Sequence, residues 1–214
     1  MQPTLVLHGY WRSSSAYRVR IALELKGLAY DQAPVNLLNG EQRSDTHRAR
    51  NPSAYVPALE VDGTTLVESM AILEWLEEAF PAPALLPRDP LARAHVRALA
   101  EIVNAGTQPL QNLWVLNHFF GSDAAAKGAW AKQVIARGLG AFEDLASRRP
   151  SAGPFCAGEA PTFADVLLVP QLYNARRFGV DLEAYPLALR AESACNALEA
   201  FKRAHPDAQP DAKP

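Results

Sequence analysis

In the first 80 residues the apolar positions change from strand-like to helix-like spacing and back, which predicts alternating strands and helices. A short strand is predicted over 4–9, followed by a helix that opens at the serines of 13–15 and ends at Gly27. Along this helix Val19, Ala22, Leu23 and Lys26 recur at the helical spacing i, i+3, i+4 and i+7. An extended stretch over 29–37 and a weaker helical segment over 42–50 follow. The strand over 4–9, the first helix and the stretch over 29–37 together form a βαβ unit, which implies parallel strands.

The next segment predicts an antiparallel hairpin followed by a helix. Two apolar-containing runs, 58–61 and 65–68, flank Asp62-Gly63, a pair typical of two-residue hairpin turns. A helix then opens at Ser69 and is closed by Pro81, since proline disrupts a helix interior. Its apolar stripe consists of Ile72, Leu73, Leu76 and Phe80. The order βαβ, ββ, α is that of a thioredoxin-like domain.

Strand signals nearly vanish in the second half of the chain. We therefore expect an α/β domain over 1–80, a proline-rich linker over 81–90 and an all-helical domain over 91–214. Apolar residues at helical spacing predict helices over 96–113, 129–145, 164–177 and 187–201. Pro109 and Pro170 fall inside these predicted helices and are expected to kink them. The last residues, 206–214, are predicted to form a loose polar tail.

The composition is that of an ordinary globular protein, and it favours a small-molecule ligand over a polyanion such as nucleic acid. The chain has 214 residues, 49% hydrophobic and 21% charged, with a net charge of −2. That charge offers no electrostatic reason to expect nucleic acid or a membrane surface as a partner. Neither a signal segment nor a membrane-length apolar run is evident, so we expect a cytoplasmic protein.

The cysteines and histidines do not suggest a redox or metal site. Cys156 and Cys195 lie far apart without a C-x-x-C partner, so we expect two buried free thiols. The five histidines lack the spacing of zinc ligands, and no metal is expected. The spacing of Thr162 and Asp165 predicts a helix capping box rather than a site.

Three consecutive serines, Ser13, Ser14 and Ser15, stand where the first helix begins. A helix start exposes unpaired N–H groups and the positive end of the helix dipole, so hydroxyls placed there can hold a thiolate or a carboxylate. Glu68-Ser69 offers a second helix start of this kind. At both places a plain serine cap is the alternative interpretation.

Val56-Pro57 lies between these two helix starts in the sequence. X-Pro bonds adopt the cis form at little cost, and in a thioredoxin-like domain a cis proline here turns the backbone of the preceding residue outward. Such a backbone can pair with a bound peptide as an added strand does, although a simple turn is the alternative. Two anion sites and this backbone would suit a short peptide that bears a thiol and a carboxylate, such as glutathione.

Four segments together carry a family resemblance that covers nearly the whole chain. They are R-S-S-S-A-Y-R-V-R-I-A-L, N-P-x-x-x-V-P, D-G-x-x-L-x-E-S and Q-P-L-Q-N-L. With them the chain resembles the zeta-class glutathione transferases, which include maleylacetoacetate isomerase. The resemblance implies the glutathione transferase fold, glutathione as cofactor and a homodimer.

The resemblance also implies a set of glutathione-binding positions on both domains. They are Ser13, Ser14, Ser15, Ala16, Tyr17, Arg18, Gln42, Val56, Glu68, Ser69, Gln108, Asn112, Leu113 and Trp114. The three serines are the candidate catalytic residues, with Ser13 as the main partner of the thiolate and Ser14 as the second choice. The family pattern usually has cysteine where this chain has Ser15, which puts in doubt any side activity that needs that thiol.

Basic residues gather around the first helix, where only Glu24 opposes Arg12, Arg18, Arg20 and Lys26. Arg20 and Lys26 are expected to be solvated surface charges. Arg12 adjoins the serines, and Arg177 resembles the family's arginine for the substrate carboxylate. Because an arginine fork binds carboxylates bidentately, both are candidates for holding a dicarboxylate-type alkene substrate.

The implied reaction is cis-to-trans isomerisation of maleylacetoacetate to fumarylacetoacetate in aromatic amino-acid catabolism, by reversible addition of the glutathione thiolate. Maleylpyruvate isomerase is an alternative, although its specialised relatives have arginines just after the asparagine that Asn112 matches, where this chain has Leu113-Trp114. A transferase or dehalogenase acting on chlorinated acids is a further alternative. A non-catalytic docking module of the same fold is the alternative from another class.

Overall fold

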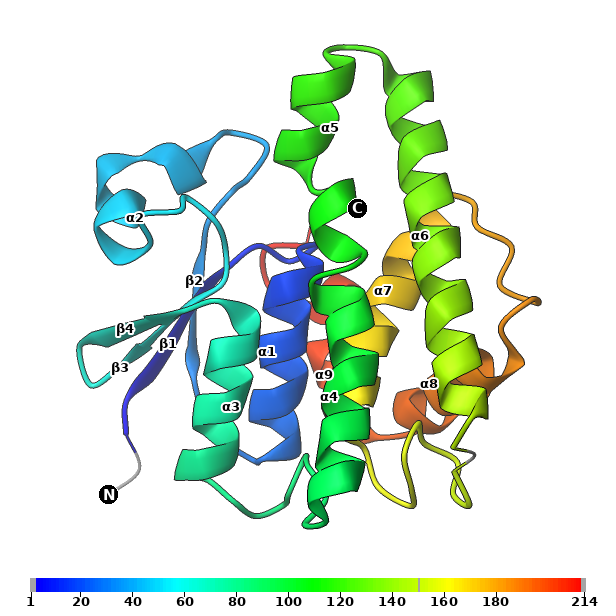
Figure 1. The fold of residues 1–214 in the computed structure, drawn as a ribbon. Helices are drawn as coiled ribbons and strands as arrows, with labels where there is room; N and C mark the ends of the chain where they lie inside the picture. Colours follow the sequence, from blue (N-terminus) through cyan, green and yellow to red (C-terminus); the bar gives the residue numbers. More distant parts are fainter. Residues whose placement is uncertain (1–2, 150, 213–214) are drawn as a thin grey trace. The chain divides into compact units, whose positions relative to one another are not determined.

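The computed structural model describes residues 3–149 and 151–212, and the chain divides into two compact units (Figure 1). The N-terminal unit comprises the residues up to Pro83 together with those from Leu198 onward. The helical unit comprises Ala84–Ala197. The sequence pattern predicted a single helical domain over 91–214, so the return of the C-terminal segment to the first unit is a difference from that expectation.

The N-terminal unit contains a four-stranded sheet in the order β2-β1-β3-β4. Its strands are β1 (Leu5–Gly9), β2 (Asp31–Pro34), β3 (Ala58–Val61) and β4 (Thr64–Val67). β1 runs parallel to β2 and antiparallel to β3, which confirms the βαβ unit. β3 and β4 form the predicted hairpin, and Asp62 and Gly63 both have positive φ angles, 47° and 84°. This backbone matches the twist of the two strands, and it is the reason for the Asp-Gly pair.

Helices of the N-terminal unit bury the predicted apolar faces. They are α1 (Ser14–Leu25), the 3-10 turn η1 (Glu41–Arg43), α2 (Asp45–Arg50), α3 (Ser69–Ala79), α9 (Glu199–Ala204) and the 3-10 turn η3 (Pro206–Ala208). α1 contacts both α3 and α9 (Figure 1). Val19 of α1 and Ile72 of α3 are fully buried, as their helical spacing predicted.

The prediction that Lys26 is a solvated charge was wrong. Its Nζ is buried and donates to the Glu77 carboxylate at 2.9 Å and to the carbonyls of Phe80 and Pro83 at 2.7 and 3.0 Å. The end of α3 leaves carbonyl groups without helical partners, and the lysine ammonium supplies three donors to this region. Only folding brings the Glu77 carboxylate, 51 residues away in the sequence, within reach of Lys26.

Arg20 and the C-terminal segment also differ from expectation, because the C-terminal segment packs against the N-terminal unit and forms hydrogen bonds with it. Arg20 is buried and donates from Nε to the Ala204 carbonyl and from Nη2 to the Trp11 carbonyl, both at 2.9 Å. The supposed tail packs on the unit through Gln209, which is 5% exposed and hydrogen-bonded to Gln32. Residues 213 and 214 of that predicted tail lie outside the described residues.

The helical unit consists of α4 (Pro90–Asn104), the 3-10 turn η2 (Gln108–Gln111), α5 (Leu113–Phe120), α6 (Ala124–Ser147), α7 (Phe163–Arg177) and α8 (Pro186–Asn196). The prediction of one continuous helix over 96–113 was wrong, because α4 ends at Asn104. Thr107 Oγ1 donates to the Ile102 carbonyl at 2.7 Å, and Pro109, which lacks an N–H donor, lies in η2. Pro170 lies inside α7 as expected.

Asp165 is a buried structural centre of the helical unit. Its carboxylate accepts the N–H and hydroxyl of Thr162 at 2.8 and 2.9 Å, which confirms the capping role, and also the N–H of Cys156 at 2.8 Å. Burial raises the pKa of Asp165. Cys156 and Cys195 are buried free thiols, as predicted. Within the described residues, no helix combines the length and apolar character needed to cross a membrane.

Candidate functional site

The start of α1 presents the three serines as a cap and the first two helical residues. Ser13 is the N-cap, and its Oγ accepts the N–H of Ala16 at 3.2 Å. This bond uses an acceptor lone pair of the hydroxyl, so its O–H remains a donor. Ser14 is buried and Ser15 is half-buried at the first two positions of α1. No acidic side chain occupies the first turn to compete for an incoming anion.

The turn before these serines packs against the residue that precedes the cis proline. The Ser13 N–H donates to the Tyr10 carbonyl at 2.9 Å and closes the turn. Tyr10, Val35 and Val56 form one buried apolar cluster, with Trp11 against it. The Val56-Pro57 bond is cis, as predicted. Among the hydrogen bonds of the described residues, none involves the backbone of Val56, which leaves its N–H and C=O for a ligand.

The start of α3 is joined to α1 by a buried hydrogen bond. Arg18 Nη1 donates to Ser69 Oγ at 3.0 Å, and the two residues are 1% and 5% exposed. Ser69 is the first residue of α3, and Glu68 before it is exposed with φ 67° and ψ 117°. Two of the predicted glutathione positions, Ser13 and Ser69, therefore belong to helix starts that are tied together within one unit.

Three of the predicted positions lie in the interior of the N-terminal unit rather than on its surface. Ala16, Tyr17 and Arg18 are each at most 1% exposed. The Arg18 side chain orients Ser69, and the Ala16 N–H holds the Ser13 hydroxyl. The sequence resemblance grouped them with the ligand contacts, whereas the structure places their side chains in the core.

The Gln42 side chain offers an acceptor that no other residue in the described part of the chain uses. It lies in η1, and its Oε1 is buried without a hydrogen-bond partner. An unpaired buried polar atom is costly, so such an atom in a native fold calls for an explanation. A ligand N–H that reaches Oε1 would satisfy it. This observation fits a peptide with amide or ammonium donors.

In the helical unit, the predicted positions after α4 are carried by η2 and the start of α5. Asn112 caps α5, where its Oδ1 accepts the Trp114 N–H at 3.0 Å, and Gln108 begins η2. Gln111 Nε2 donates to Gln171 Oε1 of α7 at 2.8 Å in a buried pair. Leu113 and Trp114 are 45% and 52% exposed, so this segment presents apolar rather than charged side chains.

The candidate arginines differ in what holds them. Arg12 is half-buried, with its guanidinium 5.1 Å from the ring centre of Trp11. Arg177 is exposed at the end of α7, and its Nη1 donates to Asn174 Oδ1 at 3.1 Å. The neighbouring Arg176 instead forms a bidentate pair with Glu192 at 2.5 and 2.6 Å, and this hydrogen bonding raises the pKa of Arg176.

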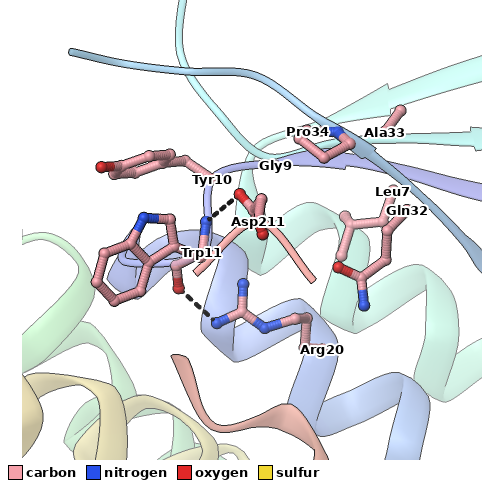
Figure 2. Close-up of a pocket in the computed structure, with 9 residues that line it drawn as sticks. All are labelled: Leu7, Gly9, Tyr10, Trp11, Arg20, Gln32, Ala33, Pro34 and Asp211. Carbon is pink, nitrogen blue, oxygen red and sulfur yellow. Dashed lines mark hydrogen bonds between the residues drawn. The ribbon is translucent and has the colours of Figure 1, made fainter. Parts of the chain in front are cut away.

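The C-terminal segment holds the turn at Trp11, which sequence reasoning missed. Asp211 Oδ2 accepts the Trp11 N–H at 3.0 Å, and Arg20 donates to the Trp11 carbonyl (Figure 2). These groups line a small pocket with Gly9, Tyr10 and Gln32. Its volume of about 10 Å³ leaves room for about one water molecule. No sequence motif marks Asp211, because its partner lies 200 residues earlier.

Comparison with known proteins identifies relatives over almost the whole chain. The glutathione S-transferase N-terminal domain family matches residues 7–84. A probable maleylacetoacetate isomerase of Drosophila melanogaster is 48% identical over 98% of this chain and 91% of its own.

Two solved structures share the fold closely. The holo structure of a maleyl pyruvate isomerase, a bacterial zeta-class glutathione S-transferase, has a TM-score of 0.94 and 45% identity over 97% of this chain and 100% of its own. The maleylacetoacetate isomerase of Anaeromyxobacter dehalogenans 2CP-1, solved with GSH in its active site, has a TM-score of 0.90 and 57% identity over 99% of each chain. The chain therefore belongs to the zeta class of glutathione transferases.

Proposed function

We propose that this protein is a glutathione-dependent cis-trans isomerase and that its physiological substrate is maleylacetoacetate. The single observation that carries the proposal is the Ser13 hydroxyl at the start of α1, which caps the helix and keeps its O–H available as a donor. This arrangement occurs in a chain that is 57% identical to a maleylacetoacetate isomerase that binds GSH.

The described residues fit glutathione in their donors and acceptors. Ser13, Ser14 and Ser15 with the first N–H groups of α1 suit the thiolate, and Ser69 at the start of α3 suits a carboxylate. Gln42 Oε1 and the backbone of Val56 offer hydrogen-bonding groups that no described residue of the protein uses. We assign further contacts to Glu68 and, from the helical unit, to Gln108, Asn112, Leu113 and Trp114.

Bound glutathione supplies a thiolate that adds reversibly to the activated alkene, so that the former double bond can rotate. The protein's part is to favour the ionised sulfur: a helix start with donor hydroxyls lowers a thiol pKa from about 8.5 to between about 3.5 and 7.5. Arg12 and Arg177 would hold the carboxylates of a dicarboxylate-type substrate and orient it. Catalysis then rests on electrostatic stabilisation that is organised before the substrate binds.

Maleylpyruvate is the second candidate substrate, because a maleyl pyruvate isomerase is also a close structural relative. The exposed apolar pair Leu113 and Trp114 favours the larger and less polar maleylacetoacetate. We also propose that the protein is a cytoplasmic homodimer that acts in aromatic amino-acid catabolism.

The decisive experiment is an isomerase assay of the purified protein on both cis substrates, with and without glutathione. We expect turnover only with glutathione and a higher kcat/KM for maleylacetoacetate. A clear preference for maleylpyruvate would reassign the substrate. Calorimetric titration with glutathione addresses the docking-module alternative, since absence of a binding heat together with absence of turnover would refute the enzyme proposal.

A further inference from the structure

The backbone of Trp11 is held at both of its polar groups by elements outside the turn in which it lies. Its N–H donates to Asp211 Oδ2 at 3.0 Å, and its carbonyl accepts from Arg20 Nη2 at 2.9 Å (Figure 2). Trp11 lies inside the turn that the Ser13 N–H closes on Tyr10. The residue two positions before the helix cap is therefore fixed from both sides.

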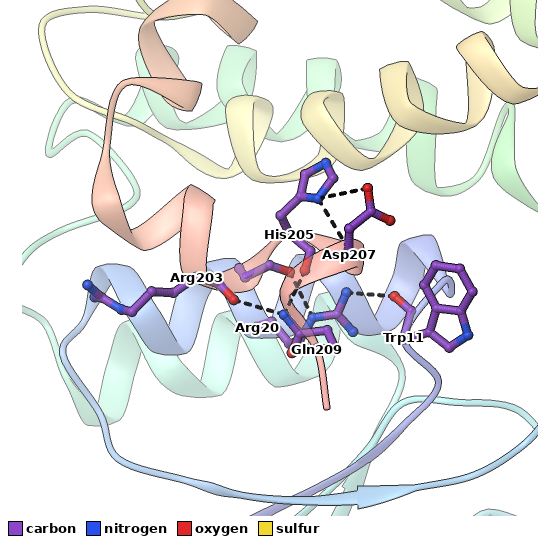
Figure 3. A network of polar contacts seen from close by, with 7 residues as sticks. Trp11, Arg20, Arg203, His205, Asp207 and Gln209 are labelled. Atoms are coloured by element: carbon purple, nitrogen blue, oxygen red, sulfur yellow. Dashed lines mark hydrogen bonds and ion pairs between the residues drawn. The ribbon is translucent and has the colours of Figure 1, made fainter. Parts of the chain in front are cut away.

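The C-terminal segment that precedes Asp211 is anchored by a network of hydrogen bonds (Figure 3). Gln209 Nε2 donates to the carbonyls of Arg203 and His205 at 2.8 and 2.7 Å. Arg20 Nε donates to the Ala204 carbonyl at 2.9 Å and so joins the segment to α1. These bonds use buried or half-buried side chains and fix the path of the chain that ends beside Trp11.

From these contacts we infer that Asp211 is a positioning residue for the thiolate-binding turn. The inference rests on the proposed function. The Ser13 hydroxyl can favour the glutathione sulfur only if the turn from Tyr10 to Ser13 keeps its geometry. Misplacement of a catalytic group by about 1 Å can cost about 100-fold in rate. Asp211 acts on the sulfur through the Trp11 peptide and does not touch it.

The test compares Asp211→Ala with Asp211→Asn and with Asp207→Ala. Asparagine keeps an acceptor oxygen for the Trp11 N–H, whereas alanine removes it. Asp207 lies in the same segment, but its carboxylate is exposed and lies 3.7 Å from His205 Nδ1. It is therefore a matched control for loss of an acidic side chain from the segment.

Three measurements apply to each variant: glutathione affinity by calorimetry, the pKa of the bound thiol by ultraviolet titration, and hydrogen exchange of the Trp11 amide without ligand. For Asp211→Ala we expect faster exchange at Trp11, about tenfold weaker glutathione binding and a raised thiol pKa. Asp211→Asn should restore most of each property, and Asp207→Ala should match the wild type.

The inference is overturned if Asp211→Ala binds glutathione with wild-type affinity and thiol pKa while Trp11 exchange increases. Equal losses in Asp211→Asn and Asp211→Ala, or in Asp207→Ala, would also overturn it, since the acceptor would not be the cause. Failure of the proposed function looks different, because the wild-type protein itself would then neither bind glutathione nor isomerise either substrate.

Discussion

Arg18 Nη1 lies 3.0 Å from Ser69 Oγ, so a buried arginine of α1 holds the first side chain of α3. The bond uses an acceptor lone pair of the serine and leaves its O–H as a donor, which parallels the state of the Ser13 hydroxyl. Both helix starts therefore combine a fixed oxygen with an available proton. That combination is what an anionic ligand needs from a serine.

Replacing Ser13 by Ala should raise the pKa of the bound glutathione thiol and lower kcat/KM. Loss of a hydrogen bond to a charged group costs about 1.5–3 kcal/mol, or roughly 10- to 150-fold. The measurement is ultraviolet titration of the complex alongside the isomerase assay. Asp123→Ala controls for loss of a cap, because Asp123 Oδ1 accepts the Ala126 N–H at 2.9 Å at the start of α6. A Ser13→Ala variant that keeps both properties would exclude Ser13 from its role.

Arg177→Leu should raise KM for the dicarboxylate substrate, whereas Arg176→Leu should mainly lower stability. Arg177 is exposed at the end of α7, while both oxygens of Glu192 are engaged with Arg176. Losing a bidentate carboxylate contact costs roughly tenfold or more in substrate affinity. Steady-state kinetics and thermal unfolding of the two variants separate the effects. Equal KM values for both would remove Arg177 from substrate binding.

Two glycines of α6 should respond oppositely to alanine. A Cβ at Gly138 would clash with Oγ1 of Thr107, whereas one at Gly140 meets nothing within 4 Å. Gly140→Ala should raise the free energy of unfolding by about 0.5–1 kcal/mol through helix propensity. Gly138→Ala should lower it by about 1–3 kcal/mol because the packed residue Thr107 must shift. Chemical denaturation measures both changes in the free energy of unfolding. Changes of the same sign would contradict the close contact between Gly138 and Thr107.

Lys26→Met should destabilise the fold by about 3–5 kcal/mol, because it removes the cation that pairs with the buried Glu77 carboxylate. The double variant Lys26→Met/Glu77→Met should recover part of this loss. Lys202→Met is the matched control, since Lys202 pairs with Glu199 on the surface and its loss should cost at most about 1 kcal/mol. Urea unfolding curves give all three values. Equal losses of stability in Lys26→Met and Lys202→Met would show that burial of the Lys26–Glu77 pair is unimportant.

The Glu60 carboxylate should stabilise the sheet in a pH-dependent way. A hydrogen bond from His8 Nε2 at 2.7 Å lowers the pKa of Glu60 below its usual 4.5. Because the folded-state pKa is the lower one, this stabilisation is present above 4.5 and is lost as the pH falls through the folded-state value. Glu60→Gln should therefore be less stable than wild type at neutral pH and equal to it in acid. Glu183→Gln, at an exposed position, controls for removal of one charge. A stability difference between Glu60→Gln and the wild type that persists in acid would contradict the role given to the Glu60 carboxylate.

Local sequence determined the elements of the N-terminal unit and the chemistry of its helix starts. Apolar periodicity defines α1 and α3, Asp62-Gly63 defines the hairpin turn, and Ser13 is a cap by residue type, since each depends on neighbours within a few positions. The family motifs added the glutathione positions.

Only the tertiary structure decided which polar groups are buried and what they hold. Lys26 and Arg20 resemble surface charges in sequence, and residues near Asp211 resemble a tail, yet each finds partners far along the chain. Their burial depends on carbonyl and carboxylate acceptors that folding brings within reach. Long-range hydrogen bonds have no sequence period, so no pattern along the chain can specify them.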